Sequence, residues 1–494
     1  MTRRQSGILV PLFSLNSARS WGIGEFPDLA IFARWAAEAG QSLVQILPIG
    51  EMPPIERSPY SAMTAMAIDP IYICLPDLQD FEGIGGELAL EPLDLAALDG
   101  VRRSPRVRYA EIRRLKDRWL RRSWDRFLRM EVARGSPRAM SFERFVAREA
   151  WWLDEYAVFR ALHALHDEHR WQDWPEALAV AEPAAVDQAR RGLHQEISFR
   201  RYLQWVAAEQ WAEAKRLAWP TRIFGDLPFM ISADSPDVWA RQGEFRFDAT
   251  IGVPPDAFSE TGQDWGLPPW RADVMATNDF AWMRARARRY ADLYDGYRID
   301  HLVGLYRAYI RPIDKSIPAF FEPADEPAQI ALGEKLTGIF QASGAEIIAE
   351  DLGVIPPFVR ASMAAQELSG VKVLQWERHY DLPGAPLVDP REFPERSMAT
   401  TGTHDIEPLA ATEAGATEEQ RAAVLQSLLA AGSNLTVIPL QDVFGWTDRI
   451  NTPAVVDEIN WTWRLPWPVE TWLDREDTIA RADQLRAWTR AADR

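Results

Sequence analysis

The stretch YDGYRIDHLVGL, residues 294–305, places three ionisable side chains inside an apolar, strand-like run. Arg298, Asp300 and His301 occupy positions where a buried strand normally holds aliphatic residues. Burying a charge is costly unless that charge is paired or used in a site. Arg298 and Asp300 are two positions apart, so on a strand both side chains point to the same face. The stretch therefore predicts a buried strand that carries a functional site.

Similar apolar runs that end in polar residues recur along the chain, at residues 42–50, 222–231, 295–304, 345–353, 370–377 and 396–405. Amphipathic helical stretches, such as residues 26–40 and 280–294, flank most of them. We interpret the opening apolar run as a first strand and not as a signal peptide, because Pro11 interrupts it and no A-x-A cleavage site follows. Strands that alternate with helices predict a parallel sheet. We expect an α/β fold, a (β/α)8 TIM barrel with helical and loop insertions between strands.

Two segments depart from this alternation. Residues 105–220 are rich in Arg, Trp and Glu and nearly free of strand signals, so a mostly helical insertion is expected within residues 75–220 of a single catalytic domain, 1–494. Many of the 22 Trp, including Trp119, Trp124 and Trp205, fall there, where packing between helices is their expected role. The Gly- and Pro-rich residues 247–270 predict a lid-like loop, since long loops in compact enzymes often cover a binding site.

Composition excludes several classes of partner. The chain has 494 residues, 47% of them hydrophobic, and a formal net charge of −17. An acidic surface disfavours nucleic acid and anionic membranes, and no run approaches the roughly 18–20 apolar residues that a membrane span needs. Cys74 is the only cysteine, so a disulfide within the chain is excluded and a cytoplasmic location is expected.

Three of the apolar runs end in acids: Asp300, then Glu350 with Asp351, and Asp405. One acid at a strand end is usually a helix cap or a solvated loop residue. In a parallel barrel, however, the carboxyl ends of all strands lie on the same face, and active sites are built on that face. Three such acids therefore favour a shared site over three unrelated caps.

Convergent carboxylates suit glycosidic chemistry, in which one attacks the anomeric carbon and another protonates the leaving oxygen. Arg298 is expected to keep Asp300 ionised, and an apolar setting is expected to raise the pKa of Glu350. His301 and His404 adjoin the acids. Their spacing is a weak metal signal, hydrogen bonding to sugar hydroxyls is favoured, and a structural role remains the alternative.

An ordered set of motifs extends this interpretation. It comprises GILVPLFSL with WGIGEF near the start, QILPIG, SPYSAMTAMAIDPIYI, GDLPFMISADSPDVWA, GVPPDAFSETGQDWG, RIDH, AEDLGVIPP, VKVLQW, TGTHD and RINTPAVVDEINWTWRL. Together they cover most of the chain and resemble the 4-α-glucanotransferases, also called amylomaltases or disproportionating enzymes, of the α-amylase superfamily. The resemblance implies a transferase of starch and glycogen metabolism that acts on malto-oligosaccharides and α-1,4-glucans with net retention through a glycosyl-aspartate.

The resemblance also implies roles for residues. Asp300 corresponds to the nucleophile, Glu350 to the general acid/base and Asp405 to the third carboxylate, which binds sugar hydroxyls. The substrate-binding positions that it implies are Arg298, His301, His404, Tyr60, Asp226, Phe258, Gln263 and Trp265. No metal or organic cofactor is implied, and monomer and homodimer both remain open.

Some positions depart from the pattern of the family. Ile406 and Glu407 follow Asp405 in place of the usual Asn, Leu302 and Val303 replace Phe and Arg, Asp69 replaces Asn, and Ala257 and Leu267 replace Tyr and Asn in the lid. These changes leave open an α-1,4-glucan hydrolase or a divergent transferase with another acceptor. An inactive glucan-binding protein is the alternative of another class, which the loss of any of the three acids would favour, but all three are present.

Overall fold

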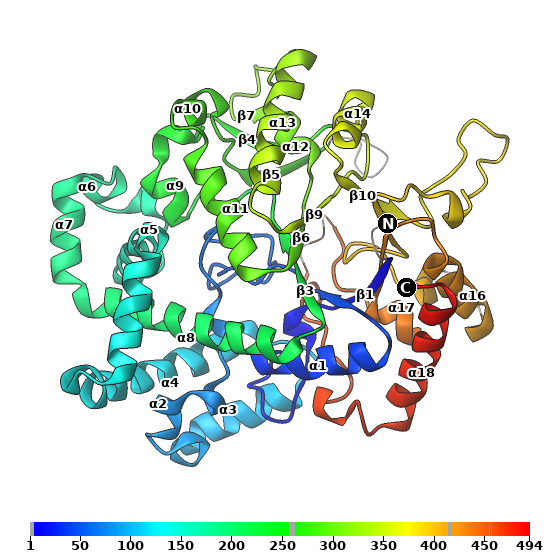
Figure 1. The fold of residues 1–494 in the computed structure, drawn as a ribbon. Coiled ribbons are helices and arrows are strands. Elements are labelled where there is room, and N and C mark those ends of the chain that lie inside the picture. The colour runs from blue at the N-terminus through cyan, green and yellow to red at the C-terminus, as the bar shows by residue number, and fades with distance from the viewer. Residues whose placement is uncertain (1–3, 256–261, 413–416, 454, 456) are drawn as a thin grey trace.

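A closed barrel of parallel strands forms the centre of the computed structural model, which describes residues 4–255, 262–412, 417–453, 455 and 457–494 (Figure 1). The strands, in their order along the chain, are β1 (Gln5–Leu9), β2 (Leu43–Gln45), β3 (Arg222–Leu227), β6 (Gly296–Ile299), β9 (Glu346–Ala349), β10 (Ser369–Val373), β11 (Ser397–Thr400) and β12 (Leu435–Pro439), and they follow the same order around the barrel. The predicted (β/α)8 barrel is confirmed.

The barrel closes because β1 pairs on both sides. Gly7 lies in register with Leu43 of β2 and with Val437 of β12. Strand β12 was not among the runs identified in the sequence, because LTVIP is short and its Thr and Pro weaken the apolar signal. All five of its residues are nevertheless buried, as expected for a parallel strand covered by helices.

Helices surround the barrel: α1 (Phe26–Glu38), α11 (Ala281–Leu293), α13 (Glu326–Gln341), α14 (Pro357–Ala365), α16 (Glu418–Leu429) and α18 (Glu476–Ala491). The local sequence determines where helix α1 begins. Glu25 and Asp28 form a reciprocal capping box, and Pro27 occupies the first turn, where its missing N–H costs no helical hydrogen bond. Its buried face then packs against α8 and β2.

The segment between β2 and β3 is helical, as predicted. It contains α2 (Gln79–Glu82), α3 (Pro92–Arg103), α4 (Tyr109–Met130), α5 (Pro137–Leu165), α6 (Glu176–Ala179), α7 (Pro183–Gly192) and α8 (His194–Ala218). Figure 1 shows these helices gathered on one side of the barrel. The packing role of the Trp residues is confirmed, since Trp119, Trp124 and Trp205 are 1%, 6% and 2% exposed.

The expectation that residues 247–270 form an irregular loop is wrong for the part that the structure describes. β4 (Ala249–Val253) and β5 (Gln263–Leu267) belong to an antiparallel sheet of order β5-β4-β7-β8, with β7 (Ala308–Pro312) and β8 (Phe320–Glu322). These strands are short and bounded by Gly and Pro, so their alternation was too brief to identify. Residues 256–261, with the predicted site residue Phe258 and the departure Ala257, lie outside the described residues.

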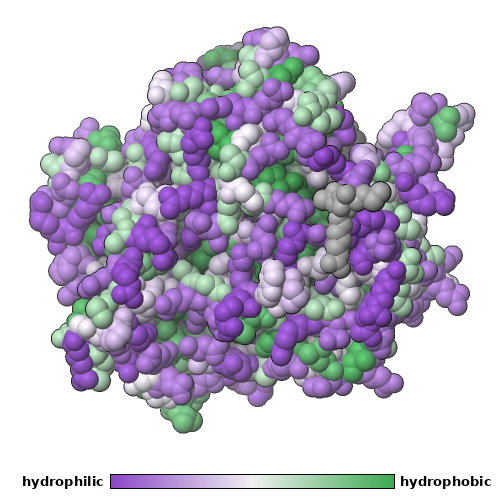
Figure 2. Space-filling view, viewed as in Figure 1, coloured by the Kyte–Doolittle hydropathy of each residue, from purple (hydrophilic) through white to green (hydrophobic). Residues whose placement is uncertain are grey.

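The remaining helices are short: α9 (Pro236–Ala240), α10 (Ala272–Thr277), α12 (Val303–Tyr306), α15 (Leu409–Thr412) and α17 (Leu440–Phe444). Figure 2 shows a face dominated by hydrophilic residues with small, scattered apolar patches, in keeping with the acidic composition. Among the helices of the described residues, none is both long enough and apolar enough to cross a bilayer.

Gly225 tests how closely the barrel is packed. A Cβ at this position of β3 would lie 2.5 Å from the ring of Tyr294, which is only 2% exposed. We expect Gly225→Ala to lower the free energy of unfolding by about 1–3 kcal/mol, the usual cost of overpacking, measured by urea unfolding with tryptophan fluorescence.

Gly338→Ala on α13 is the matched control, because a Cβ there would meet no heavy atom within 4 Å. We expect it to leave stability unchanged or to raise it by up to about 1 kcal/mol through helix propensity. Equal unfolding midpoints for the two variants would contradict the packing described for β3.

Candidate active site

The acids predicted from the sequence lie at one end of the barrel. Asp300 directly follows β6, Glu350 directly follows β9, and Asp405 lies in the loop after β11. Strands β6 and β9 are neighbours in register, with Arg298 opposite Ile348 and Ile299 opposite Ala349. All three acids therefore stand at the carboxyl ends of parallel strands, the face on which barrel enzymes build active sites.

Arg298 joins two of the strands at this end. Its Nη1 donates to both carboxylate oxygens of Asp226 at 3.1 Å, and Nη1 and Nη2 each donate to Oδ1 of Asp300 at 2.8 Å. Asp226 lies opposite Arg298 in the β3–β6 register, and both side chains are buried. Arg298 and Asp300 therefore share a face of the strand, as their spacing predicted.

The pKa of Asp300 depends on more than the attraction of Arg298, which was the one effect that the sequence led us to expect. Burial raises the pKa of Asp300, and the attraction of Arg298 opposes that rise without cancelling it, while the charge of Glu350 adds to it. Burial likewise raises the pKa of Asp226 to about 7, against the opposing charge of Arg298. One guanidinium shared between two carboxylates does not hold both in their ordinary pKa range.

Glu350 is held by backbone amides. Its Oε2 accepts from the N–H of His301 at 2.7 Å, and its Oε1 accepts from the N–H of Leu352 at 2.9 Å. His301 reaches this position with a φ of +46°, a conformation that residues other than Gly rarely adopt. Burial raises the pKa of Glu350 although Arg298 and both N–H groups oppose the rise, which agrees with the direction predicted.

Tyr60 links the Arg298 cluster to the loop after β11. Its hydroxyl donates to Oδ2 of Asp226 at 2.8 Å, and its ring stacks on His404 with centroids 4.8 Å apart. One face of Tyr60 is therefore occupied by His404, whereas the resemblance assigned the ring to a sugar. Trp461 lies beside both rings: its ring centroid is 5.7 Å from that of Tyr60 and 5.5 Å from that of His404.

Asp405 is the most strongly acidic of the three carboxyl groups. Burial raises its pKa, but His404 at 3.3 Å and the Asn451 amide at 2.5 Å outweigh burial and hold the pKa at about 2. Burial lowers the pKa of His404, and the charge of Asp405 overcomes this effect, so the net shift is upward. Asn451 and Trp461 were not singled out in the sequence, although both lie in the motif RINTPAVVDEINWTWRL.

A second aromatic group adjoins His301. The ring centroids of Trp265 and Phe229 lie 4.9 Å and 5.2 Å from that of His301, and both rings meet it edge to face. The indole N–H of Trp265 donates to Oε1 of Gln263 at 3.2 Å. The structure thus brings Trp265, Gln263 and His301 together, as predicted. Burial also lowers the pKa of His301 to about 4, so this imidazole is neutral at pH 7.

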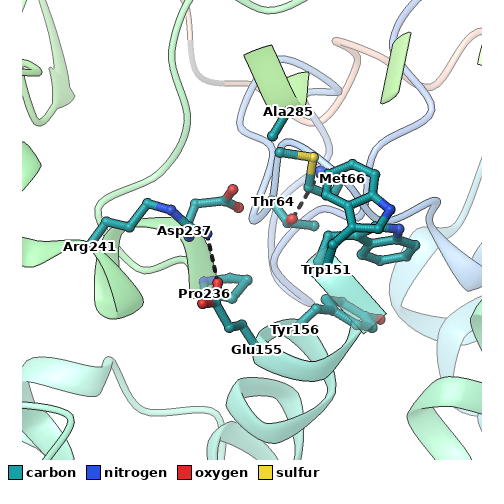
Figure 3. A pocket seen from close by; sticks show the side chains of 10 residues that line it. Thr64, Met66, Trp151, Glu155, Tyr156, Pro236, Asp237, Arg241 and Ala285 are labelled. Atoms are coloured by element: carbon teal, nitrogen blue, oxygen red, sulfur yellow. Dashed lines mark hydrogen bonds and ion pairs between the residues drawn. The ribbon is translucent and has the colours of Figure 1, made fainter. Parts of the chain in front are cut away.

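A small hollow that opens to solvent lies elsewhere, between α5, α9 and α11. Figure 3 shows Trp151, Glu155 and Tyr156 of α5 facing Asp237 and Arg241 across it. The ion pair between Arg241 and Glu155, at 2.9 Å, crosses this space, and none of the three strand-end acids lines it. Across the described ranges, no group of three or more His, Cys, Asp or Glu side chains is arranged to hold a metal ion.

The structure is a (β/α)8 barrel whose strand ends carry clustered carboxylates, a shared guanidinium and adjoining aromatic rings, an arrangement that suits glycosyl transfer. A sequence profile described as 4-alpha-glucanotransferase matches residues 10–470. A 4-alpha-glucanotransferase of Thermus thermophilus is 33% identical over 501 residues, which cover 94% of each chain. A 4-alpha-glucanotransferase of Chlamydia pneumoniae is 29% identical over 94% of this chain and 92% of its own length.

Solved structures agree with this assignment. The amylomaltase from Streptococcus agalactiae in complex with acarbose is similar with a TM-score of 0.83 and 26% identity, over 100% of both chains. The amylomaltase from Corynebacterium glutamicum shares the fold, with a TM-score of 0.80 and 22% identity over 97% of this chain and 75% of its own. The chain belongs to the 4-alpha-glucanotransferase family, and it is a transferase enzyme.

The two site histidines are expected to titrate on opposite sides of the ordinary pKa of 6.5. His301 should stay neutral throughout pH 5–8, and His404 should retain its proton above pH 6.5. Imidazole NMR shifts followed over pH 4–9 measure this difference, and His301→Gln and His404→Gln identify the signals among the 7 histidines. Ordinary titration near pH 6.5 at both positions would contradict the burial and pairing described.

Proposed function

We propose that this chain is a retaining α-1,4-glucan transferase in which Asp300 is the nucleophile, Glu350 the general acid and base, and Asp405 the carboxylate that binds the hydroxyls of the donor sugar. The observation that carries the proposal is the meeting of these acids at the ends of β6, β9 and β11, with Arg298 bonded to Asp300. The nucleophile needs this cation because burial alone would favour its neutral form.

The first half of the reaction forms a covalent intermediate. Glu350 gives its proton to the bridging oxygen while Oδ2 of Asp300, the oxygen that Arg298 does not bind, attacks the anomeric carbon. The bond between that carbon and the oxygen breaks, the first glucan leaves as an alcohol, and a β-linked glycosyl-aspartate remains. A raised pKa suits Glu350 to this role, because the acid must hold its proton near neutral pH.

The second half reverses these steps with a new acceptor. Glu350, now ionised, takes the proton of an incoming 4-hydroxyl, whose oxygen attacks the anomeric carbon and displaces Asp300. The α-1,4 bond forms again with net retention. Asp405, anionic with a pKa of about 2, accepts hydrogen bonds from hydroxyls of the donor sugar in both halves, beside His404, whose pKa it raises.

Transfer exceeds hydrolysis when sugar, and not water, fills the acceptor side of the site. Trp265 and His301 offer apolar ring surface there, and Leu267 on the same strand is half-buried. We propose that residues 247–270 cover the bound glucan and that the helices of residues 75–220 form a subdomain of the single catalytic domain. Malto-oligosaccharides are the proposed substrates, and a cytoplasmic location is proposed for an enzyme whose cysteine, Cys74, is free and buried.

Incubation with maltotriose tests the reaction class. A transferase produces glucose together with longer oligosaccharides while total reducing ends stay constant. We expect Asp300→Asn and Glu350→Gln to lower this activity by at least about a thousandfold, the scale usual for the loss of a reacting group. Rising reducing ends with glucose and maltose alone would instead make the enzyme a hydrolase.

An activated glycosyl fluoride separates the two roles, because fluoride leaves without a proton. Glu350→Gln should release a burst of fluoride and accumulate the glycosyl-enzyme, visible as added mass on the intact protein. Asp300→Asn should release no burst. Fluoride release by Asp300→Asn as fast as by the parent enzyme would exclude Asp300 as nucleophile.

Trp265→Ala is expected to raise the ratio of hydrolysis to transfer several-fold, because water gains access to the glycosyl-enzyme. Trp219→Ala is the matched control, since Trp219 is 74% exposed and follows α8 at the amino-terminal end of β3, the opposite end of the barrel. The products of each variant from maltotriose are compared by chromatography. An unchanged ratio in Trp265→Ala would remove Trp265 from the acceptor side.

A further inference from the structure

Asp442 is a buried acid that the proposed reaction does not use. It lies on α17, the short helix that directly follows β12, and it is 4% exposed. Its Oδ2 accepts from the hydroxyl of Thr401 at 2.5 Å, and its Oδ1 accepts from the backbone N–H of Leu409 at 2.7 Å. Each carboxylate oxygen therefore has one donor.

Those two donors stand at the ends of one loop. Thr401 is the first residue after β11, and Leu409 begins α15. His404 and Asp405 lie between them. A single side chain thus fixes the positions of both ends of the segment that presents the third acid to the donor sugar.

The middle of the loop is held separately. Nη2 of Arg449 donates to the carbonyl of Asp405 at 2.5 Å, and the N–H of Asn451 donates to the carbonyl of His404 at 3.1 Å. Asp405 can therefore keep its orientation only when both the ends and the middle of the loop are in place.

The chemistry of Asp442 fits a geometric task. Its two donors, a hydroxyl and an amide, are neutral, and burial raises its pKa to about 6 against their opposing effect. A carboxylate buried with neutral partners costs free energy that a smaller or apolar residue would avoid. What an apolar residue cannot supply is two acceptor oxygens, one for each end of the loop.

We propose that Asp442 is a positioning residue of the glucan-transfer reaction, which acts through the loop 401–409 to place Asp405 against the hydroxyls of the donor sugar. The inference rests on the proposed role of Asp405. It makes α17, which follows the strand next to β11, part of the machinery that orients the substrate.

A double-mutant cycle tests whether Asp442 acts through Asp405. Initial rates with a glycosyl fluoride donor are measured for the parent enzyme, Asp442→Ala, Asp405→Asn and the double variant. We expect Asp442→Ala alone to lower kcat about 10- to 100-fold, the scale of a small misplacement of a reacting group. In the Asp405→Asn background the same substitution should cost less than about 3-fold, because the contact that it misplaces is already lost.

Two further variants separate position from folding. Asp442→Asn keeps the shape and the acceptor for Leu409, and should recover most of the kcat that Asp442→Ala loses. Thr401→Val removes one of the two donors at nearly constant volume, and should lower kcat less than Asp442→Ala. Both remain informative even where Asp442→Ala fails to fold.

Asp94→Ala is the matched control. Asp94 is also 4% exposed and accepts from the indole N–H of Trp119 at 2.9 Å, within the helical segment. We expect its loss to lower the unfolding temperature. If Asp94→Ala also lowers activity, we expect it to do so by the same factor in the parent enzyme and in the Asp405→Asn background.

The outcomes distinguish the two hypotheses. Full activity in Asp405→Asn would overturn the proposed role of Asp405. A strongly lowered but measurable rate in Asp405→Asn, together with multiplicative losses in the cycle as in Asp94→Ala, would overturn the positioning role of Asp442 alone. Activity in Asp442→Asn no better than in Asp442→Ala would also count against it.

Discussion

One guanidinium group, that of Arg298, lies between the buried carboxylate of Asp226 and the half-buried carboxylate of Asp300, and the rest of the site is attached to it. The β3–β6 register places Asp226 opposite Arg298, and Asp300 directly follows β6. Removal of one partner from such a buried cluster leaves an uncompensated charge, typically at a cost of about 3–5 kcal/mol. Tyr60 bonds to Asp226, His404 stacks on Tyr60, and Asp405 pairs with His404. The β3–β6 register and the geometry of the site therefore meet at this contact.

Within this arrangement, the pairing and the burial of each ionisable group determine the charge that the group carries. Asp405 has its pKa lowered to about 2, so the stability gained from its pairing is present above its unfolded pKa and is lost as pH falls toward 2. His404 has a raised pKa, so its contribution is complete below its unfolded value of about 6.5 and is lost as pH rises through the folded value. The pair is thus an anion and a cation together in a window between those limits. At Asp300 and Glu350 the neighbouring charges and hydrogen bonds do not cancel the effect of burial, so the pKa of each carboxyl group is raised.

Sequence reasoning identified what local patterns determine. Apolar runs located seven barrel strands, and acids at their ends located Asp300, Glu350 and Asp405. It failed where the signal was short or the partner distant. β12 has only five residues, and β4 and β5 are equally short and each contain a Gly. Asn451 and Trp461 reach the site only because the barrel closes. The sequence also did not reveal that Arg298 serves two carboxylates, or that burial raises the pKa of Asp300 against its attraction.

The three acids are anchored by different means, and this difference explains which departures the site tolerates. Glu350 is held by the N–H groups of His301 and Leu352, which any residue except proline would provide. Leu302 and Val303 are buried in the turn that follows, so they fill space without touching the carboxylate bonds. Asp405 is held by His404 and Asn451, and its loop by Arg449 and Asp442, groups that lie outside positions 406 and 407. Ile406 and Glu407 can therefore replace other residues without releasing the acid, and Glu407 in turn faces Arg449 at 3.4 Å. The substitutions at positions 406 and 407 thus leave the contacts that anchor the Asp405 carboxylate in place.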